Sequence, residues 1–307
     1  MPKVSVIIPT YNCAKYLPEA IESALNQTFQ DFEIIIVNDG SADNTNQIIK
    51  PYLEQYPEKI KYFEQENKGL AITRNVAIDN SKGEYIALLD SDDTFLPNRL
   101  ENGVNILSSQ LDVDLTHANI KYLSEDGKDL GVLKRNPKYL NGYIFNNILL
   151  LKAHLSLPTI LIRKRSFGTH GKFDENLSRL GCEDREMWLR ISKDCKIVYQ
   201  DTVLACYRIR QNSMSKNFKL MTEARNYVLN KYCPPTSFSN KIKRRIYFSD
   251  ISNQFSGEYY NNTDYRSATK AILKAISIWP FSLSSWIILA KCLSKFSFIR
   301  KVNACDN

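Results

Sequence analysis

The chain has 307 residues, 43% of them hydrophobic and 24% charged, which is the composition of a soluble globular protein with one large domain or one domain and an appendage. Its seven cysteines are odd in number and include no CxxC pair, which argues against a disulfide framework or a zinc site and favours a reducing cytoplasm. The net charge of +8 lies almost wholly in residues 240–307, which hold 11 Lys and Arg against 4 Asp and Glu.

The first hundred residues alternate short apolar runs with segments of helical spacing. These patterns predict strands at 4–8, 33–37, 59–64 and 85–89, and helices at 17–25, 45–56 and 70–78. Pro51 should bend or split the second helix. The first apolar run ends at Pro9 and is too short for a signal peptide. Because the runs lack polar alternation, they favour a parallel sheet that helices cover on both faces.

Beyond residue 110 the alternation loosens. The patterns predict strands at 114–123, 158–162 and 196–209, and helices at 141–151, 184–191, 241–253, 264–277 and 283–296. Pro234 and Pro235 mark a break, so the chain divides into residues 1–233 and a basic helical extension, 234–307. The longest uncharged stretch, between Lys274 and Lys291, has 16 residues. That is shorter than the roughly 20 residues of a membrane-spanning helix.

Polar segments follow each of the first four predicted strands. They are Pro9, Thr10, Tyr11 and Asn12; Asn38, Asp39, Gly40 and Ser41; Glu66, Asn67, Lys68 and Gly69; and Asp90, Ser91, Asp92 and Asp93. The carboxyl ends of parallel strands share one edge of a sheet, and ligands bind at that edge. One such segment alone is most simply a turn, but four at one edge predict a ligand site.

The acidic segment DSDD suggests a metal site. Asp90, Asp92 and Asp93 repel one another unless a cation or solvent lies between them. Oxygen ligands suit Mg²⁺ or Mn²⁺, which take one or two carboxylates and complete their shells with water and phosphate. The alternative is a solvated helix start, with Asp92 or Asp93 as the cap of a helix at 95–107.

Two further residues allow two interpretations each. Asp39 can accept a hydrogen bond from a base edge, with the Tyr11 ring nearby for stacking, or it can close an Asx turn. Arg74, on a predicted helix, can reach a phosphate from the same edge or remain a surface charge.

Four ordered motifs, VSVIIPTYN, IIIVNDGSADNT, NKGLAITRN and YIALLDSDD, together resemble family 2 of the inverting glycosyltransferases. The likeness is strong over residues 1–110, a nucleotide-binding half. It resumes in residues 111–233, an acceptor half, at KFDENLSRLGCEDREMWLRI and YRIRQNSMS. The resemblance implies the α/β fold called GT-A, with a mostly parallel central sheet flanked by helices. It also implies transfer of a hexosyl or N-acetylhexosaminyl group from a nucleotide sugar, best matched by a UDP-sugar, to an acceptor hydroxyl with inversion.

The resemblance assigns roles to individual residues. Asp184 would be the general base, and Asp92 with Asp90 would hold Mn²⁺ or Mg²⁺. The residues that would contact the nucleotide sugar are Pro9, Thr10, Tyr11, Asn12, Asp39, Gly69, Arg74, Asp90, Ser91, Arg208, Arg210 and Ser213. The chain departs from the family pattern twice. Arg210 stands where histidine is frequent and should contact phosphate instead of metal, and Cys182 stands where glycine is usual before Glu183.

Other functions have weaker support in the sequence. A nucleotidyltransferase of related fold should carry a Gly-rich loop after the first strand, where this chain has PTYN. A dinucleotide-dependent oxidoreductase should carry G-x-G-x-x-G, which is absent. A nucleic-acid-binding protein could use the basic KIKRR segment, but no nucleic-acid motif accompanies it, so we expect no nucleic-acid partner. An inactive relative should lack some of the acidic positions, all of which are present here.

The expected acceptor is a saccharide or a lipid-linked saccharide, as in polysaccharide or cell-surface glycan synthesis. The tail segment ISIWPFSLSSWIILAKCLSKFSFIRK combines tryptophans, an apolar surface and basic flanks, including Arg300 and Lys301. That combination is typical of a helix lying on a membrane surface; the alternative is that the segment packs on the catalytic domain with its lysines solvated. We therefore expect a cytoplasmic protein with peripheral membrane contact as one option for its tail.

Overall fold

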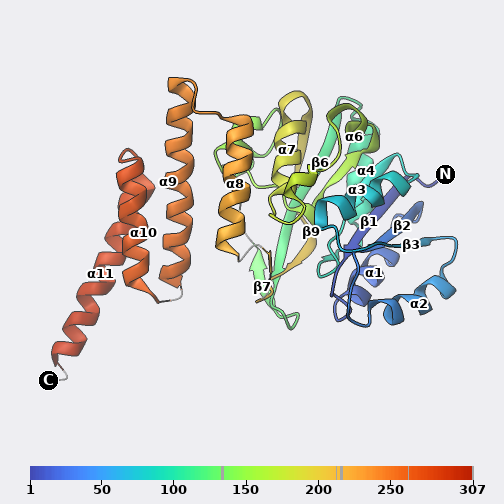
Figure 1. Cartoon of the computed structure of the whole chain (residues 1–307), viewed down its shortest axis with the longest axis horizontal. Coiled ribbons are helices and arrows are strands. Elements are labelled where there is room, and N and C mark those ends of the chain that lie inside the picture. The colour runs from blue at the N-terminus through green and yellow to red at the C-terminus, as the bar shows by residue number, and fades with distance from the viewer. Residues whose placement is uncertain (133–134, 212, 215–216, 262, 306–307) are drawn as a thin grey trace. The chain divides into compact units, whose positions relative to one another are not determined.

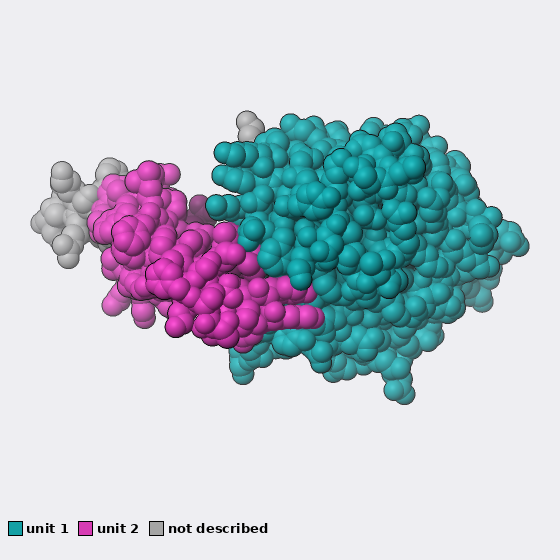
Figure 2. All heavy atoms as spheres, turned by 90° about the horizontal axis from the view of Figure 1, so that it is seen from above, with its two compact units in different colours: residues 1–148, 152–228 teal, residues 149–151, 229–307 magenta. Residues whose placement is uncertain are grey.

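The computed structural model describes residues 1–132, 135–211, 213–214, 217–261 and 263–305. The chain forms two compact units, coloured separately in Figure 2. Unit 1 comprises Met1–Ile148 and Lys152–Val228, and unit 2 comprises Leu149–Leu151 and Leu229–Asn307.

Unit 1 is built on one mixed sheet (Figure 1). Its strands are β1 (Val4–Thr10), β2 (Phe32–Asn38), β3 (Ile60–Glu64), β4 (Tyr85–Leu88), β5 (Thr94–Phe95), β6 (Val113–Leu123), β7 (Asp129–Val132), β8 (Leu161–Arg163) and β9 (Lys196–Arg208). Among the described residues their order is β3-β2-β1-β4-β8-β6-β9-β5, with β7 beside β6. Strands β3, β2, β1 and β4 are parallel neighbours, as are β6 and β9. Strands β8, β5 and β7 pair antiparallel.

Helices cover both faces of the parallel part. The helices of unit 1 are α1 (Leu17–Leu25), α2 (Thr45–Gln55), α3 (Leu70–Asn80), α4 (Arg99–Ser109), α5 (Phe145–Leu149), α6 (Lys164–His170), α7 (Glu183–Asp194) and most of α8 (Phe218–Tyr232). Successive strand residues point to opposite faces. Val6 and Ile34 belong to one apolar cluster with side chains of α1, α2 and α4, whereas α3 contacts β1 and β2. The expected α/β architecture with flanking helices is confirmed.

Two local expectations were wrong, and of the bend or split expected at Pro51 the split is absent. The helix expected at 95–107 begins only at Arg99, because Thr94 and Phe95 pair as a strand with β9. Asp92 and Asp93 therefore cap no helix. Helix α2 continues through Pro51 unsplit. The helix expected at 141–151 is only the shorter α5, because Gly142 has φ of 84° and exchanges backbone hydrogen bonds with Ile197.

Unit 2 is helical. It contains the end of α8 together with α9 (Phe238–Asn261), α10 (Tyr265–Ile278) and α11 (Leu283–Cys305). Helix α10 packs on both α9 and α11. Hydroxyl groups of Ser249 and Ser256 on α9 donate to the Ala275 and Ala268 carbonyls of α10, at 3.1 and 2.9 Å. Across the part of the chain that is described, no helix combines the length and apolar character that crossing a membrane requires.

Candidate active site

Four polar segments meet at one edge of the sheet, as the sequence predicts. The register pairs Thr10 with Asn38 and Asn38 with Glu64, so β1, β2 and β3 end level with one another. Strand β4 runs parallel to β1, with Leu88 opposite Ile7, and its acidic continuation follows at the same edge.

The segments after β1 and β2 hold each other through short hydrogen bonds. The Asn12 amide donates to Ser41 Oγ at 2.9 Å, and the Ala42 amide donates to Asn12 Oδ1 at 2.8 Å. Asn12 adopts a left-handed conformation, with φ of 48°, which asparagine tolerates better than most residues. Pro9 and Thr10 are buried, whereas Tyr11 is 51% exposed. Tyr11 thus presents a ring at the edge that a planar group can stack on.

Asp39 is buried and organises the segment after β3. Its Oδ1 accepts from Gln65 Nε2 at 2.7 Å and from the Lys68 amide at 2.8 Å, and its Oδ2 accepts from the Gly69 amide at 2.8 Å. A carboxylate can accept about four hydrogen bonds, so acceptor capacity remains. Gly69 has φ of 90°, and a Cβ there would lie 2.5 Å from the Ser178 carbonyl oxygen, so only glycine fits.

Asp90 and Asp92 each bind an arginine through one oxygen. Arg74 Nη2 lies 2.6 Å from Asp90 Oδ1, and Arg210 Nη1 lies 2.9 Å from Asp92 Oδ2. About a quarter of each carboxylate side chain, 26%, stays exposed. Burial and the neighbouring Asp90 charge raise the pKa of Asp92, although Arg210 opposes this shift. Arg210, expected to contact phosphate, thus lies directly beside a carboxylate that is expected to hold the metal.

Asp93 and Arg208 hold this acidic turn against the end of β9. The Arg208 amide donates to Asp93 Oδ1 at 2.9 Å, and Arg208 Nε donates to the Asp92 carbonyl at 3.0 Å. Asp93 is 2% exposed, and burial raises its pKa well above the usual value. Arg208 also pairs with Glu19 of α1 and lies over the Tyr16 ring, 5.0 Å from its centroid. Asp93 is thus a structural member of the acidic segment.

Arg74 joins the acidic segment to the start of α7. Its guanidinium is 1% exposed and binds Glu183 Oε1 at 2.5 Å as well as Asp90. The alternative of a surface charge is therefore wrong. Since Asp90 and Glu183 lie far apart in the sequence, the buried arginine fixes the distance between two segments that the family resemblance links to chemistry.

Asp184 follows Glu183 in the first turn of α7 and is half-buried. Its Oδ1 accepts from the Arg185 amide at 2.6 Å. Burial raises the pKa of Asp184, and the charge of Arg74 opposes the shift. The preceding Cys182 adopts a left-handed conformation, with φ of 62°, at the position where the family favours glycine. The backbone at residue 182 thus takes a conformation that suits glycine although the residue is cysteine. Glu183 and Asp184 still begin α7.

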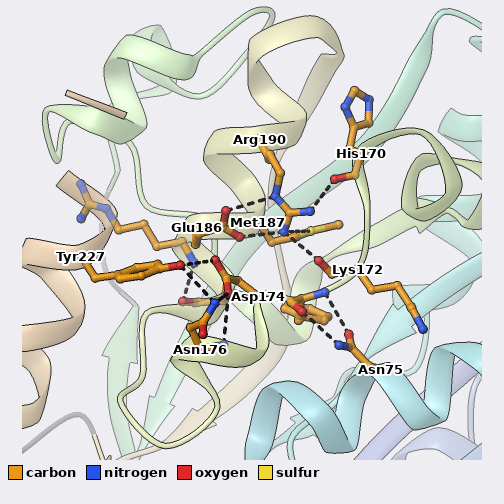
Figure 3. A network of polar contacts seen from close by, with 12 residues as sticks. Asn75, His170, Lys172, Asp174, Asn176, Glu186, Met187, Arg190 and Tyr227 are labelled. Carbon is orange, nitrogen blue, oxygen red and sulfur yellow. Dashed lines mark hydrogen bonds and ion pairs between the residues drawn. The ribbon is translucent and has the colours of Figure 1, made fainter. Parts of the chain in front are cut away.

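A network of polar contacts anchors α7 to its neighbours (Figure 3). Arg190 binds the fully buried Glu186 one turn earlier at 2.7 Å and donates to the Lys172 carbonyl at 2.8 Å. Asn75 on α3 exchanges two hydrogen bonds with the Phe173 backbone. On the other side, the Tyr227 hydroxyl of α8 donates to Asp174 at 3.0 Å. The helix carrying Asp184 is therefore fixed against α3, which carries Arg74.

Asp90 and Asp92 fit a divalent cation of the Mg²⁺ or Mn²⁺ type. Both are oxygen donors with exposed surface, and Asp92 has a raised pKa, as expected of a carboxylate crowded by another. No group of three or more metal-binding side chains occurs among the described residues. Such a group is not required, because these cations usually take one or two carboxylates plus water and substrate phosphate.

The structure also brings in residues that the sequence did not single out. Cys13 is buried, with Sγ 3.0 Å from Arg210 Nη1. Glu125, in the turn between β6 and β7, accepts from the Gln211 amide at 3.2 Å and from the Tyr16 hydroxyl. Only Cys13, directly after PTYN, carried a sequence signal. Ser213 is half-buried, while Asn212 and Ser215 lie outside the described residues.

Comparison with known proteins identifies the class and then the family. In fold, the chain resembles the crystal structure of S. aureus TarS 1–349 in complex with UDP-GlcNAc, with a TM-score of 0.62 and 23% identity over 90% of this chain and 81% of that one. This likeness shows that the chain has the GT-A fold. A family model described as glycosyl transferase family 2 matches residues 5–171. The chain belongs to glycosyl transferase family 2.

Two relatives illustrate the breadth of the similarity. An uncharacterised glycosyltransferase of Rickettsia felis is 31% identical over 87% of this chain and 44% of its own length. The O-antigen biosynthesis glycosyltransferase WbnJ of Escherichia coli is 30% identical over 80% of this chain and 94% of its own. The chain spans between 35% and 64% of the length of the rickettsial relatives it matches.

Proposed function

We propose that the chain is an inverting glycosyltransferase that moves a hexosyl or N-acetylhexosaminyl group from a UDP-sugar to a hydroxyl of a saccharide or lipid-linked saccharide. The observation that carries the proposal is the buried Arg74, which ties the DxD segment at Asp90 to the Glu183-Asp184 pair. The similarity to TarS, solved with UDP-GlcNAc, supports a uridine donor, and the similarity to WbnJ supports a role in polysaccharide or cell-surface glycan synthesis.

The donor nucleotide is bound at the edge formed by the first three strands. Tyr11 is exposed enough to stack on the base, and Asp39 Oδ2, with one hydrogen bond from Gly69, can accept another from the base edge. The loop amides that Asp39 organises keep this carboxylate oriented before the nucleotide arrives. Ser91, Arg208, Arg210 and Ser213 border the diphosphate.

Asp184 is the general base of the reaction. It removes the proton of the acceptor hydroxyl as that oxygen attacks the anomeric carbon and the nucleotide diphosphate leaves. The raised pKa of Asp184 makes it a stronger base than an exposed aspartate, and α7 holds it in place. One base without an enzymic nucleophile gives a single displacement, which inverts the anomeric configuration.

Asp92 and Asp90 would hold a Mn²⁺ or Mg²⁺ ion. When bound, the ion neutralises the negative charge that develops on the leaving diphosphate. Arg210 and Arg208 add fixed positive charge beside the same carboxylates.

Nucleotide release from a panel of UDP- and GDP-sugars, with Mn²⁺ and with a chelator, tests the proposal. We expect UDP release from at least one UDP-sugar that requires metal and increases with a saccharide acceptor. Turnover of GDP-sugars alone would overturn the uridine assignment, and full activity in chelator would overturn the metal assignment.

We also propose that unit 2 lies on an anionic membrane surface. Phe281, Leu283 and Trp286 are 80%, 74% and 49% exposed, and the exposed Lys274 and Lys291 flank them. An apolar surface with cationic flanks binds anionic lipid, at about 1 kcal/mol for each basic residue. The side chains of Arg300 and Lys301, also expected to contribute, lie outside the described residues.

Flotation with phosphatidylserine vesicles at low salt tests this proposal. Wild-type protein should float, and Phe281→Ser with Trp286→Ser should abolish flotation. Leu130→Ser, a change of the same kind at an exposed apolar residue on β7 of unit 1, should leave flotation unchanged. Wild-type protein that stays in solution at low salt would refute membrane binding.

A further inference from the structure

A cavity lies at the opposite edge of the sheet from the candidate active site. Its volume is about 780 Å³, and its lining comes from the starts of β1 and β4, the end of α3 and the junction of β8 with α6. The candidate active site lies at the carboxyl ends of β1 and β4, so a ligand here would not touch Asp90 or Asp184. The volume falls within the range of small-molecule sites.

The lining of this cavity, which we call the amino-edge cavity, is strongly cationic. Its positive residues are Lys3, Lys82, Arg163, Lys164, Arg165 and Lys172. Its negative residues are Glu84 and Asp79, and each already pairs with a lysine, Glu84 with Lys3 at 2.5 Å and Asp79 with Lys172 at 2.6 Å. Arg165 also pairs with Asp114, which lies outside the lining, at 3.3 Å. Six positive residues against two lining carboxylates and Asp114 leave an excess of three positive charges.

Arg163 gives the cavity a built cationic wall. Its side chain is 5% exposed, and Nε donates to the Val113 carbonyl at 2.8 Å while Nη2 donates to the Gln110 carbonyl at 3.2 Å. Nη1 lies 3.5 Å from Glu84 Oε1, across the cavity lining. Arg163 and Lys3 share the Glu84 carboxylate, so one negative charge is set against two cations, which favours an anion nearby. By contrast, Lys82 is exposed and its ammonium is free to approach a ligand.

The remaining lining leaves room for the ligand. The buried side chains of Ile78 and Phe167 contribute apolar surface. Gly168 on α6 also lines the cavity, and a Cβ there would meet no atom within 4 Å. A larger residue at Gly168 would therefore enter open space without disturbing the fold.

We propose that the amino-edge cavity binds a small, multiply charged phosphate anion, such as a compound with a diphosphate group. The site is separate from the donor site, so binding there does not depend on whether the chain transfers sugar.

Calorimetry of inorganic pyrophosphate binding to the full chain tests the proposal. The buffer contains a chelator, which suppresses metal-dependent binding at the acidic segment. We expect Lys82→Glu to weaken binding by roughly tenfold, because one nearby positive charge becomes negative. Gly168→Leu should weaken it by occupying the space. Lys50→Glu, which makes the same charge change at an exposed position on α2 outside the cavity, should not.

Equal binding by wild type and Lys82→Glu, or equal weakening by Lys50→Glu, would overturn the proposal, since either result means unspecific attraction. Nucleotide release by Lys82→Glu should match wild type. Failure of the cavity proposal can thus be told from failure of the proposed activity.

Discussion

Replacing Arg74 with methionine should destabilise the protein strongly. The substitution preserves much of the side-chain volume but removes a guanidinium that is 1% exposed and binds two carboxylates at 2.6 and 2.5 Å. Asp90 is 26% exposed and can be solvated, whereas Glu183 is 7% exposed and would remain as a buried charge without a partner. Breaking a buried ion pair by removing one partner costs about 3–5 kcal/mol. We expect a loss near that size in the free energy of unfolding.

The loss should depend on pH in a defined direction. Burial raises the pKa of Glu183, and Arg74 opposes that shift, so removing Arg74 raises the folded-state pKa further. An acid whose folded pKa lies above its unfolded pKa destabilises the fold at high pH and less so as the pH falls. The difference between wild type and Arg74→Met should therefore narrow as the pH falls through this raised pKa toward the unfolded value of about 4.3.

A double-mutant cycle in urea is the assay. Glu183→Gln should cost less than Arg74→Met, because Arg74 keeps Asp90, and the double variant should cost at least ~1 kcal/mol less than the sum of the single variants. The ion pair of Arg74 with Glu183 would not be a stabilising contact if the losses of the two single variants added to within about 0.5 kcal/mol. The same would follow if Arg74→Met lowered the free energy of unfolding by less than about 1 kcal/mol.

Two further outcomes follow from the site. Asp92→Asn should abolish metal-dependent nucleotide release with little change in the urea midpoint of unfolding. The control Asp126→Asn, at an exposed turn position, should leave the release rate unchanged. A normal rate for Asp92→Asn in saturating Mn²⁺ would contradict the metal assignment. Gly69→Ala should destabilise the protein by more than about 1 kcal/mol, because its φ is 90° and a Cβ would meet Ser178. Gly168→Ala on α6 should stabilise the protein by about 0.5–1 kcal/mol, because a Cβ there meets no atom. Urea unfolding of the two variants measures both effects. Equal effects would show that the protein accommodates a Cβ at Gly69 with little loss of stability.

The sheet and the edge of the site follow from local sequence patterns. The apolar runs at Val4–Ile8 and in EIIIV predict buried strands, and parallel strands place their carboxyl ends together. Tyr11 and Asp39 could therefore be placed at one edge without a structure. Their family roles came from the resemblance, not from periodicity.

Contacts between distant segments were not predictable from the same patterns. Thr94 and Phe95 have no strand signal of their own and are extended because they pair with Cys206 and Ala205. From the sequence alone, Arg74 on its helix is indistinguishable from a surface charge, because only tertiary packing places Glu183 beside it. The same holds for Glu125, which lies in an exposed turn and meets the site through Gln211.

The most direct test of the account compares Asp184→Asn with wild type in two measurements on one preparation, UDP binding by calorimetry and sugar transfer in a single turnover. The account predicts nearly equal UDP affinity and transfer at least ~100-fold slower, which is the usual effect of losing a general base. If UDP affinity falls as much as the transfer rate, or if transfer stays near the wild-type rate, Asp184 is not the base and the proposed mechanism is wrong.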